Sequence, residues 1–378
     1  MPTPPRDTAT LQRAVDLVAA HGSIAKAARA SGLPRTTLGD HYHDAISRGF
    51  APGAPVPPEG FTRYASSVLT GEDGEIQRWD KYRLDPQKER ELMEALVQGF
   101  LEPIKGKSRP TKPPQNTDSD ILTAYIIGDA HLGLYAWEPE AGEDFDTDIA
   151  ARDICAAIDY LVRAAPRSDE CIIAQLGDFL HMDDSSNATP ASGNQLDVDS
   201  RFPRVVRVAI RTLRYCIDAA LKRHRVVRIR NVAGNHDPHA SIAITEALRG
   251  YYEQNDRVVI EDSLRAMWAF RFGRNLIGIT HGHAPKPDKM AGALAVDYAA
   301  EWGQTDFKYI WHGHIHHRRV IEDMGCLIES FRTLAARDKY HADAGYRSGR
   351  EMQSIVLHKE YGETARAMAG LKRIREAA

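Results

Sequence analysis

The chain of 378 residues is long enough for one large domain and one or two small ones, and its 43% hydrophobic content can supply a core. No apolar run approaches the about 18 residues of a membrane span, and residues 1–6 lack the apolar core of a signal peptide, so we expect a cytoplasmic protein without membrane contact. A formal net charge of −3 excludes global attraction to nucleic acid, so any such binding must come from local patches.

Residues 8–50 predict three short helices, because apolar side chains recur at helical spacing and Gly22 and Gly32 interrupt the pattern. Ser23 is a suitable N-cap for the second helix, and the third is expected to begin at Thr36. Ala28, followed four residues later by Gly32 and then by Leu33 and Leu38, resembles the helix-turn-helix pattern of DNA-binding domains, in which a small residue lets the helices cross and glycine makes the turn. That resemblance implies DNA contacts from Arg35, Thr36 and Thr37 and phosphate contacts from Arg29 and Arg48. The alternative is a small helical module that binds protein.

Residues 51–118 are expected to connect this module to the rest of the chain. The proline-rich residues 51–58 predict a stiff linker, residues 61–82 a β-hairpin with its turn at 71–74, and residues 86–101 a helix. Residues 105–114 carry four basic side chains among prolines, a composition more typical of a solvated tether than of a phosphate site. We therefore predict a helical domain at 1–50, a connecting region at 51–118 and a large domain at 119–378.

In the large domain, five apolar runs each end on side chains that bind metal ions. The runs are 122–128, 170–176, 226–233, 275–280 and 308–311, and they lead into Asp129-Ala130-His131, Gly177-Asp178, Gly234-Asn235-His236-Asp237, His281-Gly282-His283 and His312-Gly313-His314-Ile315-His316. Amphipathic helices at 148–165 and 203–223 separate the first three runs, which predicts a mostly parallel sheet covered by helices. Because ligand sites in such sheets lie outside the carboxyl ends of the strands, these side chains should meet at one edge.

Two expectations concern the remainder of this domain. After residue 316 the pattern predicts only a short hairpin and a charged final helix, and the four scattered cysteines predict reduced core residues without disulfides. The long loop at 182–201 contains Asp183, Asp184, Asp197 and Asp199, which we expect to be solvated.

The ordered set D-x-H, G-D, G-N-H-D, H and G-H-x-H resembles the calcineurin-like metallophosphoesterase superfamily. The resemblance implies an α/β fold, a four-layer αββα sandwich with its site at the sheet edge, here preceded by the small all-α helix-turn-helix-like domain. It further implies two divalent metal ions, the first held by Asp129, His131, Asp178 and His316 and the second by Asp178, Asn235, His281 and His314. Asp178 would then bridge the two ions. A donor set without thiolate suits Mn²⁺, Fe or Zn²⁺ better than Mg²⁺, and we expect Mn²⁺.

Two further histidines receive roles from the same resemblance. His236 matches the family histidine that stabilises the transition state or protonates the leaving alkoxide. The run Gly-Asp-Phe-Leu-His is similar to the Gly-Asp-Leu-Phe-His of SbcD-like DNA repair nucleases, which implies that His181 helps place the scissile phosphate. His283, His312 and His317 flank candidate ligands and are either supporting residues or polar surface. An additional domain before the catalytic one is an arrangement associated with phage enzymes.

The leading functional prediction is a nuclease that hydrolyses DNA phosphodiester bonds by attack of a metal-bridging hydroxide, with the N-terminal helices docking on DNA. The alternative is hydrolysis of a small-molecule phosphoester, with the N-terminal helices binding protein. A third reading, a DNA-binding regulator with an inactive large domain, is disfavoured because the ligand set is intact. The native metal, the oligomeric state and an ATPase partner stay open.

Overall fold

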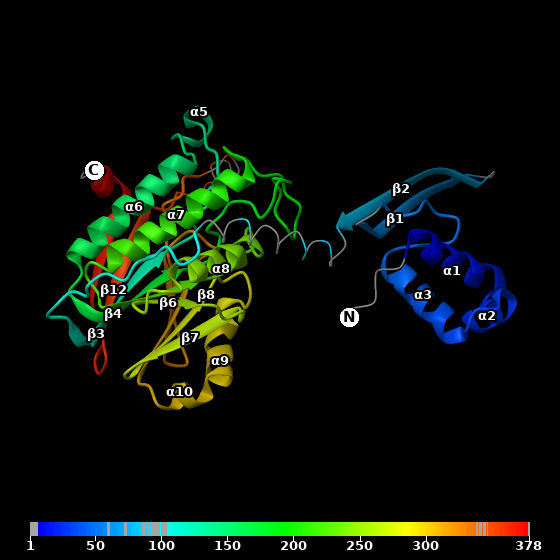
Figure 1. The fold of residues 1–378 in the computed structure, drawn as a ribbon. Helices are drawn as coiled ribbons and strands as arrows, with labels where there is room; N and C mark the ends of the chain where they lie inside the picture. The colour runs from blue at the N-terminus through cyan, green and yellow to red at the C-terminus, as the bar shows by residue number, and fades with distance from the viewer. Residues whose placement is uncertain are drawn as a thin grey trace. The chain divides into compact units, whose positions relative to one another are not determined.

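The computed structural model describes residues 7–58, 61–71, 74–84, 88, 91, 99, 104–337, 339, 342, 345 and 347–376. The chain divides into two compact units, Met1–Ala95 and Leu96–Ala378 (Figure 1). The helix predicted over residues 86–101 lies outside the described residues, apart from three single positions. None of the helices among the described residues is long and apolar enough to cross a membrane.

The first unit contains the three predicted helices and the predicted hairpin. Its elements are α1 (Thr8–His21), α2 (Ile24–Ser31), α3 (Arg35–Ser47), β1 (Phe61–Gly71) and β2 (Gly74–Leu84). Gly22 and Gly32 end α1 and α2 in the left-handed conformation, with φ of 70° and 73°, which a glycine adopts without steric cost. The side chain of Ser23 caps α2 by accepting a hydrogen bond from the backbone N–H of Lys26. These local signals explain why the helical bounds were predictable.

The second unit begins with a six-stranded sheet. In spatial order its strands are β13 (Gly362–Gly370), β12 (Glu351–His358), β3 (Asp118–Ile127), β4 (Ser168–Gln175), β5 (Val226–Asn231) and β6 (Val258–Glu261). Strands β3 to β6 are parallel, whereas β12 and β13 are antiparallel to their neighbours. One face is covered by α6 (Thr147–Ala164), α7 (Phe202–Ala220) and α8 (Ala240–Tyr252), with α12 (Leu371–Glu376) next to α6 (Figure 1).

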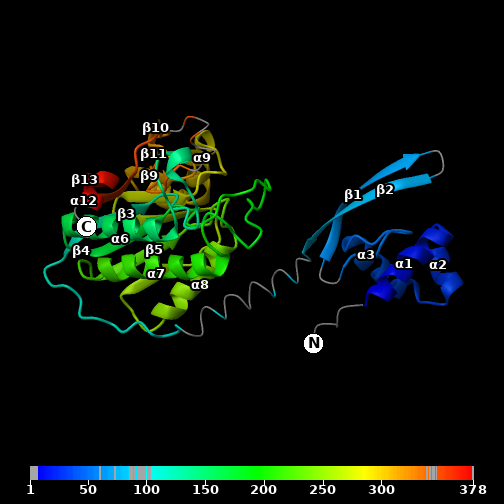
Figure 2. The same cartoon turned by 90° about the horizontal axis from the view of Figure 1, so that it is seen from above.

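A second sheet of five strands lies against the other face of the first. In spatial order its strands are β10 (Arg319–Asp323), β11 (Cys326–Ser330), β9 (Phe307–His312), β8 (Asn275–Thr280) and β7 (Met267–Phe272). Two helices, α9 (Pro287–Asp297; labelled in Figure 2) and α10 (Ala299–Gly303; labelled in Figure 1), cover its outer side. The short α5 (Glu138–Ala141) lies in the connection between β3 and α6.

The alternation of side chains along β3 shows how the layers are held together. Leu122, Ala124 and Ile126 belong to the apolar core between the two sheets, whereas Tyr125 and Ile127 belong to the core beneath the helices. A third apolar cluster lies between the five-stranded sheet and α9. The order helix, sheet, sheet, helix confirms the four-layer sandwich that the sequence motifs implied.

The region after residue 316 differs from the prediction. It forms two hairpins, β10–β11 and β12–β13, and β12 is an interior strand of the first sheet, paired with β3. The single short hairpin was wrong because β12 is buried on both faces, with Met352 under the helices and Ile355 between the sheets. Burial on both faces removes the alternation that identifies a strand. All four cysteines are free, as predicted, and three of them are buried.

Candidate metal centre

Five strands from both sheets deliver polar side chains to one edge of the sandwich. Asp129 and His131 follow β3, Asp178 follows β4, Asn235 and His236 follow β5, His281 follows β8, and His314 and His316 follow β9. Three groups of metal-binding side chains result, each with its ligand atoms within 4.8 Å of one another: Asp129, His131 and His316; Asp178, His281 and His314; and His131, His181 and His236. The first two groups correspond to the two predicted metal positions.

In the first group, the two imidazoles face each other. The Nε2 atoms of His131 and His316 are 3.1 Å apart, and the His316 Nε2 lies 3.6 Å from Oδ1 of Asp129. That carboxylate is fully buried, and its Oδ1 accepts the backbone N–H of His314 at 2.7 Å. The Thr333 hydroxyl donates to the backbone carbonyl of Asp129 and thereby holds the start of the loop. A carboxylate and two imidazoles therefore converge on one point.

In the second group, His281 is oriented as a ligand. Its Nδ1 lies 2.8 Å from the carbonyl oxygen of Leu176, and since a carbonyl only accepts, Nδ1 carries the proton. The lone pair of the neutral ring is then on Nε2, which lies 3.1 Å from Oδ2 of Asp178 and 3.0 Å from Oδ1 of Asn235. Three acceptor atoms that face one another need a cation or a proton between them. The hydrogen bond from Nδ1 to a backbone carbonyl is the kind that orients metal-bound histidines in proteins.

The backbone at the candidate ligands is strained. Among the described residues other than glycine, seven have positive φ, and four of these are candidate ligands: His131 (45°), Asp178 (49°), His314 (70°) and His316 (55°). Such conformations cost about 1–3 kcal/mol each and persist where the surrounding structure holds them, typically at functional sites. The strain therefore falls on the residues that the motifs single out.

Two glycines permit the close approach of neighbouring loops to the buried carboxylates. A Cβ atom at Gly234 would collide with the carboxylate of Asp178, and one at Gly313 would collide with that of Asp129. Both glycines immediately precede a candidate ligand in the sequence, Asn235 and His314. The glycines of the G-N-H-D and G-H-x-H motifs are thus required by packing against the site and not by positive φ.

The donor atoms fit a pair of divalent cations. Oδ2 of Asp129 is buried and has no hydrogen-bond partner among the residues that the structure describes. Burial alone would raise the pKa of Asp129 and of Asp178, but the neighbouring imidazoles hold both pKa values below the ordinary value of an aspartate. Burial likewise disfavours the charged form of His281, yet Asp178 raises its pKa to about 9. A proton on His281 therefore compensates the negative charge when no cation does.

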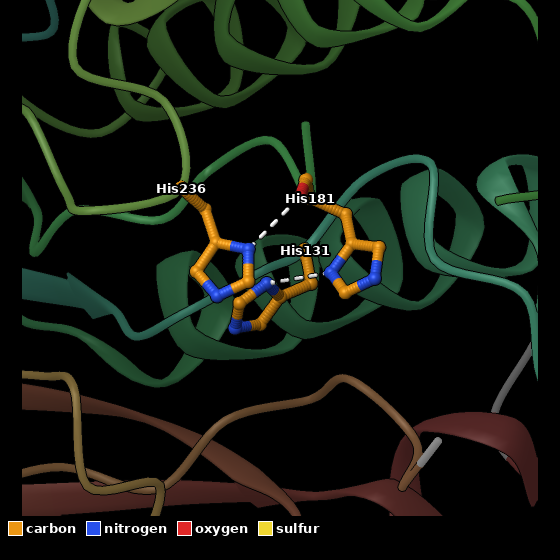
Figure 3. A group of neighbouring side chains, drawn as sticks. All are labelled: His131, His181 and His236. Carbon is orange, nitrogen blue, oxygen red and sulfur yellow. Dashed lines mark hydrogen bonds between the residues drawn. The ribbon is translucent and has the colours of Figure 1, made fainter. Parts of the chain in front are cut away.

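The third group consists of three histidine rings packed together (Figure 3). The rings of His181 and His236 are stacked with centroids 5.3 Å apart, and each is edge-on to His131. Nδ1 of His236 lies 2.9 Å from the carbonyl oxygen of His181, and Nδ1 of His181 lies 3.2 Å from Nδ1 of His131. Both histidines with predicted catalytic roles therefore lie beside the first metal position.

Asp237, to which the sequence analysis gave no role, supports the site. Asp237 is fully buried, and its carboxylate accepts the backbone N–H groups of Leu180 and Gly234, each at 3.0 Å. Burial and the nearby Asp178 raise the pKa of Asp237 to about 7. Asp237 is the last residue of the G-N-H-D motif, and this position in the motif could have identified it as a functional residue.

Asp183 was expected to be solvated, and this was wrong. It is 6% exposed and accepts the backbone N–H of His239 at 3.0 Å, the backbone N–H of Ala240 at 2.7 Å, and His239 Nδ1 at 2.5 Å. It therefore ties the 182–201 loop to the start of α8. No local pattern distinguishes it from its neighbour Asp184, because its partners lie far along the chain.

The remaining candidate residues occupy varied positions. His312 is buried with its Nδ1 3.0 Å from the Gly313 carbonyl oxygen, His317 is exposed, and the His283 ring centroid lies 5.2 Å from that of His281.

The predicted DNA contacts lie in the first unit, where Arg29, Arg35 and Thr36 are exposed and Thr37 and Arg48 are partly buried. Arg48 pairs with Asp44 at 2.9 Å.

Substituting Asp178 should remove metal. In Asp178→Asn the ligand group loses its charge. Changes in residues that only hydrogen-bond to metal ligands typically lower metal affinity by about 10–100-fold, so the loss of the ligand's own charge should lower it at least as much. Metal content after chelation and reloading with Mn²⁺ measures this effect, with the exposed Asp297→Asn as the matched control. Retention of two ions per chain in Asp178→Asn would contradict the assignment.

Metal binding should release protons. His281 has a raised pKa of about 9 in the protein without metal and must be neutral to ligate, so its proton has to leave at any pH below about 9. Apparent metal affinity should therefore fall by about tenfold per pH unit on acidification below pH 9 for this one proton. Titration calorimetry at pH 7 in buffers of different ionisation enthalpy counts the protons, and a count of zero would show that His281 is not a ligand.

No protein-family model matches the sequence, and no curated protein matches it. Solved structures similar to the chain include a dimetal phosphatase from Danio rerio (10% identity, TM-score 0.36, covering 66% of this chain and 99% of that one), a novel archaeal phosphodiesterase (13%, 0.32, 65% and 99%) and Yfce, a phosphoesterase from E. coli (11%, 0.30, 65% and 98%). The similar structures thus correspond to about two thirds of this chain.

Proposed function

We propose that the second unit is a phosphoesterase that uses two divalent metal ions. The observation that supports this most directly is the convergence of two carboxylates, one carboxamide and four imidazoles, from five strands, on two adjacent points. Two divalent ions bound there would activate water as a nucleophile and stabilise charge on the oxygens of a phosphoester. Asp129, His131 and His316 would hold one ion, Asn235, His281 and His314 the other, and Asp178 both, with Mn²⁺ the ion we expect.

His236 is suited to move a proton. Because its Nδ1 donates to the carbonyl oxygen of His181, the second ring nitrogen, Nε2, is the one that can carry or accept the transferable proton. The backbone N–H of His236 donates to Oδ1 of Asp178 at 2.8 Å, and this hydrogen bond fixes the position of His236 beside a candidate metal ligand. We assign His236 the protonation of the leaving oxygen.

His181 has a different role in the proposal. It is 2% exposed, its ring stacks on that of His236, and its Nδ1 lies 3.2 Å from Nδ1 of His131. A polar ring in this position adjoins both the proposed acid and a candidate metal ligand. We assign it the placement of the scissile phosphate beside the first metal position.

We propose DNA as the substrate, cut at its phosphodiester bonds, with the first unit as the DNA-docking module. In support, α2, the Gly32 turn and α3 follow one another as in helix-turn-helix domains, and Arg29 and Arg35 are exposed. Since Arg48 is engaged by Asp44, phosphate contacts would depend mainly on Arg29 and Arg35.

One observation favours the alternative, a small phosphoester as substrate and a protein partner for the first unit. Helix α3 carries Asp40 and Asp44 against the single Arg35, so its charge does not by itself attract a phosphate backbone. The two proposals share the metal centre and differ in the substrate and in what the first unit binds.

Removing the imidazole of His236 should separate proton transfer from metal binding. His236→Ala should retain both ions and lose about 10²- to 10⁴-fold in kcat on DNA, which is the usual contribution of general acid catalysis. The loss should be smaller on bis-p-nitrophenyl phosphate, whose leaving group needs no proton. The exposed His317→Ala serves as the control. Loss of metal from His236→Ala, or equal losses on both substrates, would refute the assigned role.

Salt dependence should distinguish the two substrates. If the first unit binds duplex DNA, the double variant Arg29→Ala/Arg35→Ala should weaken DNA binding and flatten the dependence of log K on log salt by about 0.9 for each phosphate that the variant no longer neutralises. Turnover of bis-p-nitrophenyl phosphate should be unchanged, and the exposed Arg13→Ala is the control. An identical salt slope in the wild type and the double variant would favour the small-phosphoester alternative.

A further inference from the structure

A cavity of about 240 Å³ opens next to the candidate metal centre. Its walls come from the end of β5, the first turns of α8, the segment between β6 and β7, and His283 after β8. Helix α8 lies beside β6, the strand that follows it in the sequence (Figure 1). The cavity therefore lies at the carboxyl end of the parallel strands, where α/β sheets bind ligands.

Two residues join the cavity to the metal centre. Gly234, which lines the cavity, precedes the candidate ligand Asn235, and His283 follows His281 by two positions. The His283 ring centroid is 5.2 Å from that of His281 and 6.2 Å from that of His314. The cavity therefore lies beside the second metal position.

The lining combines apolar walls with a polar end. Ile242 and Leu264 are large apolar residues that are 42% and 85% exposed, and they offer surfaces for a flat ring. Polar groups come from His283 and from Asn231, whose buried Oδ1 has no hydrogen-bond partner among the described residues. Apolar walls with a few placed polar groups are the usual composition of a site for an organic ring.

The charged side chains around the cavity are balanced. Glu246 and Asp262 share Arg249, at 3.0 and 2.6 Å, and Glu261 shares Arg228 with Glu170. Arg265 lines the same cavity, and no carboxylate among the residues that the structure describes forms an ion pair with it. Its guanidinium lies 5.5 Å from the centre of the Tyr298 ring, which orients it at the rim. Arg230 also lines the cavity and donates to the backbone carbonyls of Ser263 and Arg265. Arg230 and Arg265 together offset the carboxylates that share Arg249 and Arg228, so the lining has no excess of charge, which suits an uncharged ring.

We propose that this cavity binds one nucleobase of the phosphodiester substrate, on the nucleoside next to the scissile phosphate. The proposal rests on the proposed phosphoesterase function and extends it by placing the base. At about 240 Å³ the cavity is smaller than the about 300–1,000 Å³ of pockets for drug-sized ligands, so it takes a single ring system. A base that stacks on Ile242 and Leu264 would present its polar edge to Asn231 and His283.

Equilibrium binding to the manganese-loaded full chain tests this placement. Thymidine 5′-monophosphate and thymidine 3′-monophosphate should be compared with methyl phosphate by titration calorimetry, because all three ligands carry the same phosphate group. At least one thymidine nucleotide should bind about tenfold more tightly than methyl phosphate, as expected for one buried base. Ile242→Trp, which fills the cavity, and Leu264→Ala, which removes a wall, should each shrink that ratio. Val296→Trp, at a residue that is 77% exposed outside the cavity, should not.

The outcomes separate this inference from the proposed function. Equal affinities for all three ligands, or a ratio that the Ile242 and Leu264 variants leave unchanged, would overturn the nucleobase site. Hydrolysis of p-nitrophenyl diesters, measured in parallel, tests the phosphoesterase itself. If the protein prefers the nucleotides but hydrolyses no diester with Mn²⁺, the nucleobase site stands and the phosphoesterase function is refuted.

Discussion

Two buried carboxylates, Asp129 and Asp178, impose the constraint on which the rest of the site depends. A carboxylate without water is stable only when positive charge or hydrogen-bond donors lie beside it. Here the donors are backbone N–H groups of His314 and His236, and the charge comes from imidazoles. The loops that bring these groups close are the ones with positive φ and with glycines that leave room for the carboxylates. The strained backbone at the ligands and the close packing of the glycines thus both result from surrounding these two carboxylates.

Much of the site could be predicted because its residues occupy one kind of position. Asp129, Asp178 and Asn235 each follow a strand of a parallel sheet, and the carboxyl ends of parallel strands lie at a common edge. The motif at each strand end identifies the residue types, and the topology then brings them together. His281 and His314 come from the second sheet, and their place opposite the first sheet was implied by the family resemblance and not by periodicity.

The features that escaped prediction depend on partners distant in the sequence. Asp183 has the same local surroundings as Asp184, and only the start of α8, more than fifty residues later, makes it a buried acceptor. Strand β12 lacks the alternation of a surface strand because both of its faces are covered. The cavity beside His283 is likewise formed by segments from four parts of the chain. No short stretch of the sequence contains both partners of these contacts.

The pairing of β12 with β3 has a consequence for how the large unit is made on the ribosome. β3 leads into Asp129 and His131, yet its antiparallel partner is synthesised more than half of the chain later. During synthesis the edge of β3 therefore stays unpaired while β4 and β5 are already available on its other side, and such open edges favour aggregation. We therefore expect β3, the strand that leads into the first ligands, to gain its second neighbour late in folding.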